Sequence, residues 1–242
     1  MPNVLTLGIF RSLSTRLLLA LSFLPLLWLA SAQLTDNARF GNLFALAERI
    51  ESGDQIDPNV IARYRYLIEE VISGGHCRSE ILMAGATVTL ADLDNNKASI
   101  LSSEWINAAA AVEAYLKHVT ACAPLNANFW LRLAMVSDAL GRPAERVAEE
   151  MILAQALAPA EQDLIIARLY AWNRMDASIL RLAHHAVEAD LRNGLLAANP
   201  ALVAPALLPI SKSLLPMLQA AIDDVTPARA LELRRNGFEV GR

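Results

Sequence analysis

Apolar side chains recur every three or four positions along most of the chain. Phe40, Leu43, Leu46 and Ile50, for example, follow one another at the spacing of a single helical face. Glycine, proline and short polar stretches interrupt this period at intervals. The pattern therefore predicts an all-α fold, with helices over residues 34–50, 58–73, 77–93, 103–122, 126–140, 143–157, 161–175 and 176–192.

Five prolines cut the chain into short pieces after the last of these helices. Proline removes a backbone donor and breaks a helix interior, so we expect a proline-interrupted helical cap or docking arm in this region. The chain then divides into an N-terminal targeting segment (1–32), an N-terminal helical pair (33–75), helical repeats (76–194) and the C-terminal cap (195–242).

The targeting segment has the composition of a secretory signal. Arg11 and Arg16 precede an apolar stretch over residues 17–30, and Ala30-Ser31-Ala32 matches a small-x-small cleavage site. Cleavage after Ala32 is one interpretation, and an uncleaved anchor associating with the inner membrane through residues 4–32 is the other. Both predict that the remaining residues are periplasmic or secreted.

Composition narrows the class of protein. The 242 residues are 55% hydrophobic and 19% charged, which excludes a disordered chain. The net charge is −4, and the acidic excess is larger beyond the targeting segment because both of its charges are positive. An acidic body gives no electrostatic reason to expect nucleic acid as a partner.

A repeat of about one helix pair is visible in the middle of the chain. Pro124 and Pro159 each close one helix just before another begins, and they lie 35 residues apart. Between them, apolar, small and turn residues follow at the intervals of a helical repeat: Trp130, Leu133, Ala134 and Gly141, and then, with one residue inserted at the turn, Val147, Met151 and Ala154.

This segment resembles the tetratricopeptide repeat family, clearly over residues 112–159 and more weakly on to residue 194. The resemblance implies antiparallel helix pairs stacked as a short α-solenoid, with a groove for a protein partner along the first helix of each pair. An antiparallel bundle with alanine-rich seams is the alternative, and the same residues are then a solvated face. The implied groove residues are Asn128, Leu131, Met135, Asp138, Asp163, Ile166, Tyr170, Asn173 and Arg174.

The two cysteines are candidates for a disulfide. Cys77 opens one predicted helix and Cys122 ends the next, so an antiparallel hairpin brings them to the same end. Two buried free thiols are the alternative. A zinc site formed with His76 and His118 is conceivable, but no recognised ligand spacing is present, and we expect no metal or cofactor.

No catalytic motif can be assembled from the sequence at a defensible spacing. We therefore expect a non-enzymatic exported adaptor for envelope proteins. Small exported proteins with degenerate repeats resemble accessory components of exopolysaccharide assembly, which suggests that setting by analogy. The alternatives are a periplasmic enzyme or ligand-binding domain with an apolar pocket, and a membrane-anchored subunit whose C-terminal segment lies on a partner.

Overall fold

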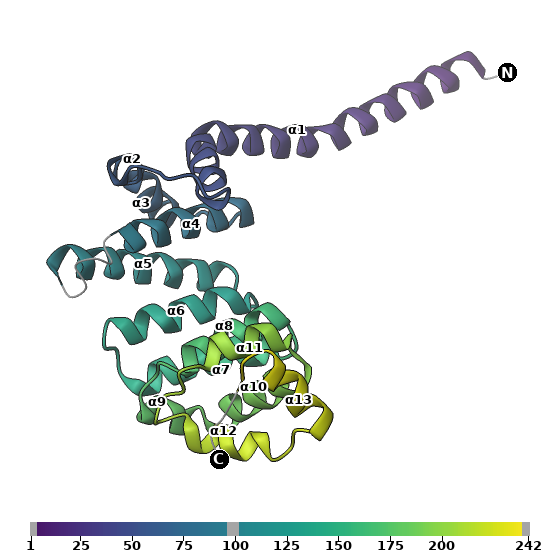
Figure 1. The fold of residues 1–242 in the computed structure, drawn as a ribbon. Helices are drawn as coiled ribbons and strands as arrows, with labels where there is room; N and C mark the ends of the chain where they lie inside the picture. Colours follow the sequence, from purple (N-terminus) through teal and green to yellow (C-terminus); the bar gives the residue numbers. More distant parts are fainter. Residues whose placement is uncertain (1–3, 96–101, 239–242) are drawn as a thin grey trace.

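The computed structural model describes residues 4–95 and 102–238, and these residues form helices joined by turns, with no strand (Figure 1). The all-α fold is thus confirmed. The helices are α1 (Val4–Glu51), α2 (Pro58–Arg63), α3 (Arg65–Ser73), α4 (Ser79–Asn95), α5 (Ser103–Cys122), α6 (Ala127–Ala139), α7 (Ala144–Leu157), α8 (Gln162–Trp172), α9 (Ala177–Leu182), α10 (His184–Ala197), α11 (Pro200–Leu207), α12 (Leu215–Ile222) and α13 (Pro227–Arg235).

The central helices begin where their capping residues indicate. The hydroxyl of Ser102 accepts the backbone N–H of Trp105 at the start of α5, and the Asn126 side chain accepts two backbone N–H groups at the start of α6. Each cap satisfies donors that a helix leaves unpaired in its first turn. Local chemistry therefore predicts these boundaries to within about one residue.

Two predicted helices are each split in the structure. The helix expected over 58–73 breaks at Tyr64, and the helix expected over 176–192 breaks at Ala183 and then continues as α10 to Ala197. The predicted end at residue 192 is thus wrong, and Gly194 lies inside α10. A Cβ at Gly194 would come within 2.5 Å of Cδ1 of Leu169, so this glycine lets α10 approach α8 closely.

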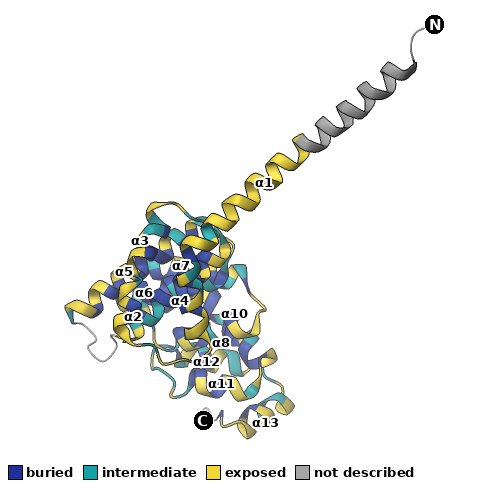
Figure 2. Cartoon of the chain, turned by 90° about the horizontal axis from the view of Figure 1, so that it is seen from above, coloured by how far each residue is buried: buried dark blue, intermediate teal, exposed yellow. Residues whose placement is uncertain are grey.

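Helix α1 extends well beyond the body of the molecule. Figure 2 shows residues 21–35 of α1 as exposed, while Phe40, Leu43 and Leu46 near the end of the helix are buried. The proposed cleavage point after Ala32 lies within this continuous helix. Over residues 4–95 and 102–238, no helix combines the length and hydropathy needed to cross a membrane.

The buried apolar residues form two clusters that meet at α6. Phe129 and Leu133 on α6 belong to a first core that they form with residues of α1 to α5. Leu131 and Ala134, also on α6, belong to a second core that they form with residues of α7 to α13. Trp130 is half-buried and packs against both clusters. Neither cluster ends at residue 75 or at residue 194, so the described chain packs continuously across those positions.

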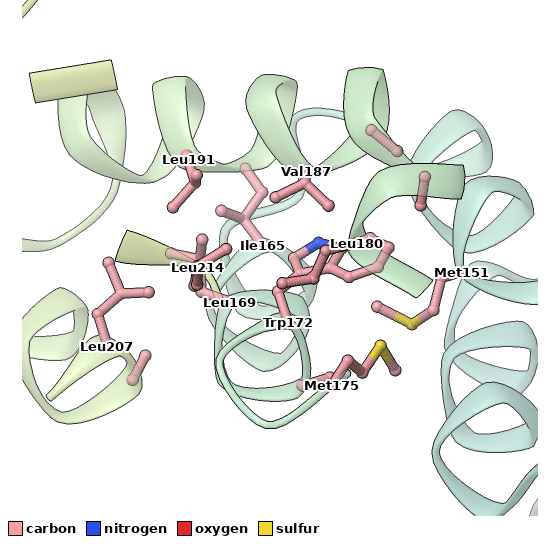
Figure 3. Packing of buried hydrophobic residues seen from close by; sticks show 14 of the residues in the cluster. Met151, Ile165, Leu169, Trp172, Met175, Leu180, Val187, Leu191, Leu207 and Leu214 are labelled. Atoms are coloured by element: carbon pink, nitrogen blue, oxygen red, sulfur yellow. The ribbon is translucent and has the colours of Figure 1, made fainter. Parts of the chain in front are cut away.

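Neighbouring helices along the chain pack on one another through this region. Helix α4 packs on α5, α5 on α6, and α6 most extensively on α7 (Figure 1). Further along the chain, α8 packs on α10 and also contacts α6. The second core fills the space between these helices, and Figure 3 labels Leu169, Trp172 and Leu191 among its members.

The C-terminal residues form a cap of short helices, as the prolines predict. Helices α11 and α13 have proline in their first turn, where its missing N–H costs nothing. Helix α11 packs on α8, and α12 packs on α10. The Leu208–Pro209 peptide bond between them is cis.

Candidate functional site

The nine residues implied by the repeat resemblance do not share one environment. Met135, Asp163, Tyr170 and Arg174 are exposed, and Asn128, Asp138, Ile166 and Asn173 are half-buried, whereas Leu131 is buried. Only part of the set is therefore accessible to a partner.

Three of the nine residues make contacts within the protein instead. Leu131 is 3% exposed in the second core, and Ile166 packs against the same core. The Asn173 amide donates to the carbonyl oxygens of Leu207 and Pro209, at 3.0 Å each, and its oxygen accepts the backbone N–H of Ser211. The chain's own C-terminal cap is thus bound to the end of α8, a contact that local sequence patterns do not reveal.

Asp138 is a carboxylate in an unfavourable position near the end of α6. Partial burial raises its pKa above the usual range, and the nearby negative charge of Asp176 raises it further. Within the described chain Asp138 makes no ion pair. A positive group from outside would relieve both effects, because it would compensate the lost hydration and screen the repulsion.

Tyr170 near the end of α8 and Arg174 in the turn that follows it form a pair on the surface. The guanidinium carbon of Arg174 lies 3.8 Å from the centre of the Tyr170 ring, and Arg174 also donates a hydrogen bond to the Tyr170 hydroxyl. Contact with the ring holds the cation in one place while Tyr170 remains 41% exposed. Tyrosine and arginine are among the residues enriched at the hot spots of protein interfaces.

Asn128 lies elsewhere, at the rim of an open cavity of about 680 Å³. The α5–α6 loop, the end of α7 and the start of α8 form this cavity, and Leu125 at its edge is 81% exposed. Glu161 is the one titratable residue among its lining residues. The cavity therefore lacks a convergent set of groups for acid–base or nucleophilic chemistry.

Cys77 and Cys122 form a disulfide between the segment before α4 and the end of α5, with Cα atoms 5.2 Å apart. His118 lies beside it, with Nε2 3.6 Å from Sγ of Cys122 and 3.0 Å from the carbonyl oxygen of His76. The His76 ring packs instead on Phe40, with centroids 4.9 Å apart. Of the four residues considered as zinc ligands, Cys77, Cys122 and His118 thus have their side chains together, and His76 does not.

Sequence reasoning missed a charged network in the second core. Arg168, Asp190 and Trp172 are all completely buried, and Asp190 accepts hydrogen bonds from both of the others. In the sequence, Arg168 lies between Ile165 and Leu169 on an otherwise apolar helical face. A charged residue at such a position is the one sequence signal for a buried network, but it does not identify the partner.

A second buried carboxylate, Glu113 on α5, connects three helical segments. Burial raises its pKa, but hydrogen bonds and charge from Arg142 and Lys117 outweigh that effect, so the pKa is lowered. Arg146 on α7 also pairs with Glu113, at 2.9 Å. This arrangement fixes α5 against the α6–α7 turn and is a structural network, since every charge in it has a partner within the protein.

Comparison of the chain with family models, with curated proteins and with solved structures returns no match. The site is therefore interpreted from its own geometry.

Proposed function

We propose that the protein is a non-catalytic adaptor that binds a protein partner through the exposed faces of α6 and α8. In this proposal the helix pairs form a short tetratricopeptide-like solenoid. The contact residues are Met135 and Asp138 on α6, Tyr170 on α8, and Arg174 in the turn after α8. The direct packing of α6 on α8 supports the view that the two helices present these residues together.

Two features of this surface carry the proposal: a carboxylate without an ion-pair partner among the described residues, and an exposed tyrosine–arginine pair. Asp138 has a raised pKa and a negative neighbour, Asp176, and Tyr170 holds Arg174 in a fixed position. A partner segment with a basic side chain for Asp138 and an acidic or apolar group beside Tyr170 fits both features. No set of catalytic side chains within the described residues favours an enzyme over this interpretation.

Export to the periplasm or cell exterior is part of the proposal. The N-terminal sequence has the features of a signal or anchor, and disulfides persist mainly in oxidising compartments. Assembly of envelope or exopolysaccharide components remains the proposed setting by analogy. Mass spectrometry of the mature protein tests export, and a chain beginning at Gln33 is the expected result.

The binding proposal is tested by capturing partners on the tagged full-length protein from detergent-solubilised envelopes. Asp138→Lys and Arg174→Glu reverse two charges on the proposed surface, and we expect each to weaken capture by about tenfold or more. Asp223→Lys and Arg181→Glu are matched reversals at exposed positions outside it. If all four variants capture a partner equally well, or all four lose it equally, the result would contradict a specific binding surface on α6 and α8.

A further inference from the structure

The cluster of sulfur and nitrogen atoms at the end of α5 has chemistry that an adaptor does not use. Within the described chain, the ligand atoms of Cys77, His118 and Cys122 all lie within 4.8 Å of one another. Thiolate sulfur and imidazole nitrogen are the preferred ligands of Zn²⁺. In the structure the two sulfurs are joined, so the cluster becomes available to a metal only after reduction.

We propose that Cys77, Cys122 and His118 form a zinc site that reduction of their disulfide opens. The position of His118 carries the inference. With Zn–S about 2.3 Å and Zn–N about 2.0 Å, the sulfur and nitrogen ligands of a tetrahedral zinc lie about 3.5 Å apart. The distance between Sγ of Cys122 and Nε2 of His118 is 3.6 Å before any metal is bound.

Helix geometry explains why these two ligands are already in place. Cys122 and His118 are one turn apart on α5, so they project from the same face of the helix. Cys77 comes from the segment before α4, and its Cα lies 5.2 Å from that of Cys122. Once the S–S bond is broken, rotation about the Cα–Cβ bonds can separate the sulfurs to the ligand spacing without moving either helix.

The surroundings also favour a metal with an open coordination position. His118 and Cys122 are half-buried, whereas Cys77 is exposed, so the site has one side toward solvent. The His76 imidazole packs on Phe40 and its Nε2 lies close to Gly74, so it does not complete the set. Three protein ligands therefore leave a fourth position for water or an external ligand.

The opening reaction is thiol–disulfide exchange with a dithiol. A thiolate of the dithiol attacks the exposed Sγ of Cys77, the S–S bond breaks, and Cys122 leaves as a thiolate beside His118. The second thiol of the dithiol then displaces Cys77, so the dithiol is oxidised to a disulfide and the protein gains two electrons.

Metal binding then changes the protonation of all three ligands. Zn²⁺ takes both cysteines as thiolates, which releases any protons they have gained. His118 binds through Nε2, so its ring proton moves to Nδ1. Its hydrogen bond to the His76 carbonyl is exchanged for the bond to the metal.

Cobalt substitution provides the direct test, because Co²⁺ occupies zinc sites and its bonds to thiolates absorb in the near ultraviolet. The full-length protein, reduced with a dithiol that is then removed under nitrogen, is titrated with Co²⁺ and then with Zn²⁺. We expect one Co²⁺ per chain with thiolate absorption, displaced by Zn²⁺, and no such absorption for the oxidised protein. Failure of the reduced protein to develop the absorption would overturn the site.

The variant His118→Gln distinguishes a role of His118 as a zinc ligand from a purely structural role. Glutamine can still donate to the His76 carbonyl but does not replace imidazole as a zinc ligand, so the variant should fold and bind Zn²⁺ at least about tenfold more weakly. His184 and His185 form a second, exposed group with Glu188, and the double variant His184→Ala/His185→Ala is the matched control. Equal Zn²⁺ affinity of His118→Gln and the reduced wild-type protein would exclude His118 as a ligand. Partner capture by these variants is a separate measurement, so failure of the zinc site leaves the adaptor proposal unaffected.

Discussion

Arg168 and Asp190 form an ion pair in the second core from which solvent is excluded. Nε of Arg168 donates to one carboxylate oxygen at 2.7 Å, and a terminal nitrogen donates to the other at 2.8 Å. Both side chains are 0% exposed. The remaining donors of Arg168 reach the carbonyl oxygens of Ala154 and Ala158 at the end of α7, so one residue joins α7, α8 and α10.

Removal of one partner from this pair should be strongly destabilising. Asp190→Ala leaves the Arg168 charge buried without compensation, and we expect a loss of about 3–5 kcal/mol in the free energy of unfolding. Urea denaturation followed by circular dichroism measures it. The double variant Arg168→Leu/Asp190→Asn removes both charges and keeps an acceptor for Trp172, so it should recover much of the loss. A double variant no more stable than Asp190→Ala would show that the charge itself is not the cause.

Tyr115 should lower the stability of the folded protein at high pH. Its hydroxyl lies 3.2 and 3.1 Å from the carbonyl oxygens of Ile81 and Leu82 on α4, and burial raises its pKa well above the usual 10.0. Above about pH 10 the unfolded chain releases this proton while the folded chain retains it. The free energy of unfolding should therefore fall by up to about 1.4 kcal/mol per pH unit.

The comparison with Tyr115→Phe isolates that effect from other titrating groups. The variant should lose about 1 kcal/mol at neutral pH, because it gives up the hydrogen bond to α4. Its unfolding free energy should then decline less steeply than that of the wild-type protein between pH 9 and pH 11. Parallel profiles for the two proteins would mean that Tyr115 ionises normally in the folded state.

The sequence predicts more of the structure over α5–α7 than in the second core, and the reason is physical. Ser102 and Asn126 act on donors two or three positions away, and the hairpin that brings Cys77 to Cys122 follows from two adjacent helices. The contacts of Arg168 with Asp190, and of Asn173 with the cap, join residues that are far apart in the chain. Such pairs depend on how helices pack in three dimensions, and no local period encodes that.

The disulfide should contribute most of its stabilisation through the unfolded chain. It closes a loop with a sequence separation of 45, for which the chain-entropy model gives about 4 kcal/mol. We expect Cys77→Ser/Cys122→Ser to lower the unfolding free energy by up to that amount. Thermal unfolding of the wild-type protein with and without reductant, in the presence of a chelator, gives an independent check. An unchanged melting temperature on reduction would contradict the cross-link.

Asp138 should show opposite effects on stability and on binding. Because its pKa is raised in the folded state, the Asp138 side chain favours folding most when it is protonated, below its unfolded pKa near 3.8, and this contribution is lost as the pH rises through the folded value. Asp138→Asn should therefore raise the urea midpoint at pH 7, and the gain should shrink as the pH is lowered toward 4. Asp223→Asn, at an exposed position outside this surface, is the matched control and should change the midpoint little.

The same Asp138→Asn variant should bind the partner more weakly if Asp138 meets a basic side chain. A residue that costs stability and contributes to binding indicates a functional surface, since packing alone would favour the neutral amide. Capture assays at pH 7 measure the expected loss of binding, with Asp223→Asn again as the control. A variant that is more stable and binds as well as the wild-type protein would place the partner elsewhere on the molecule.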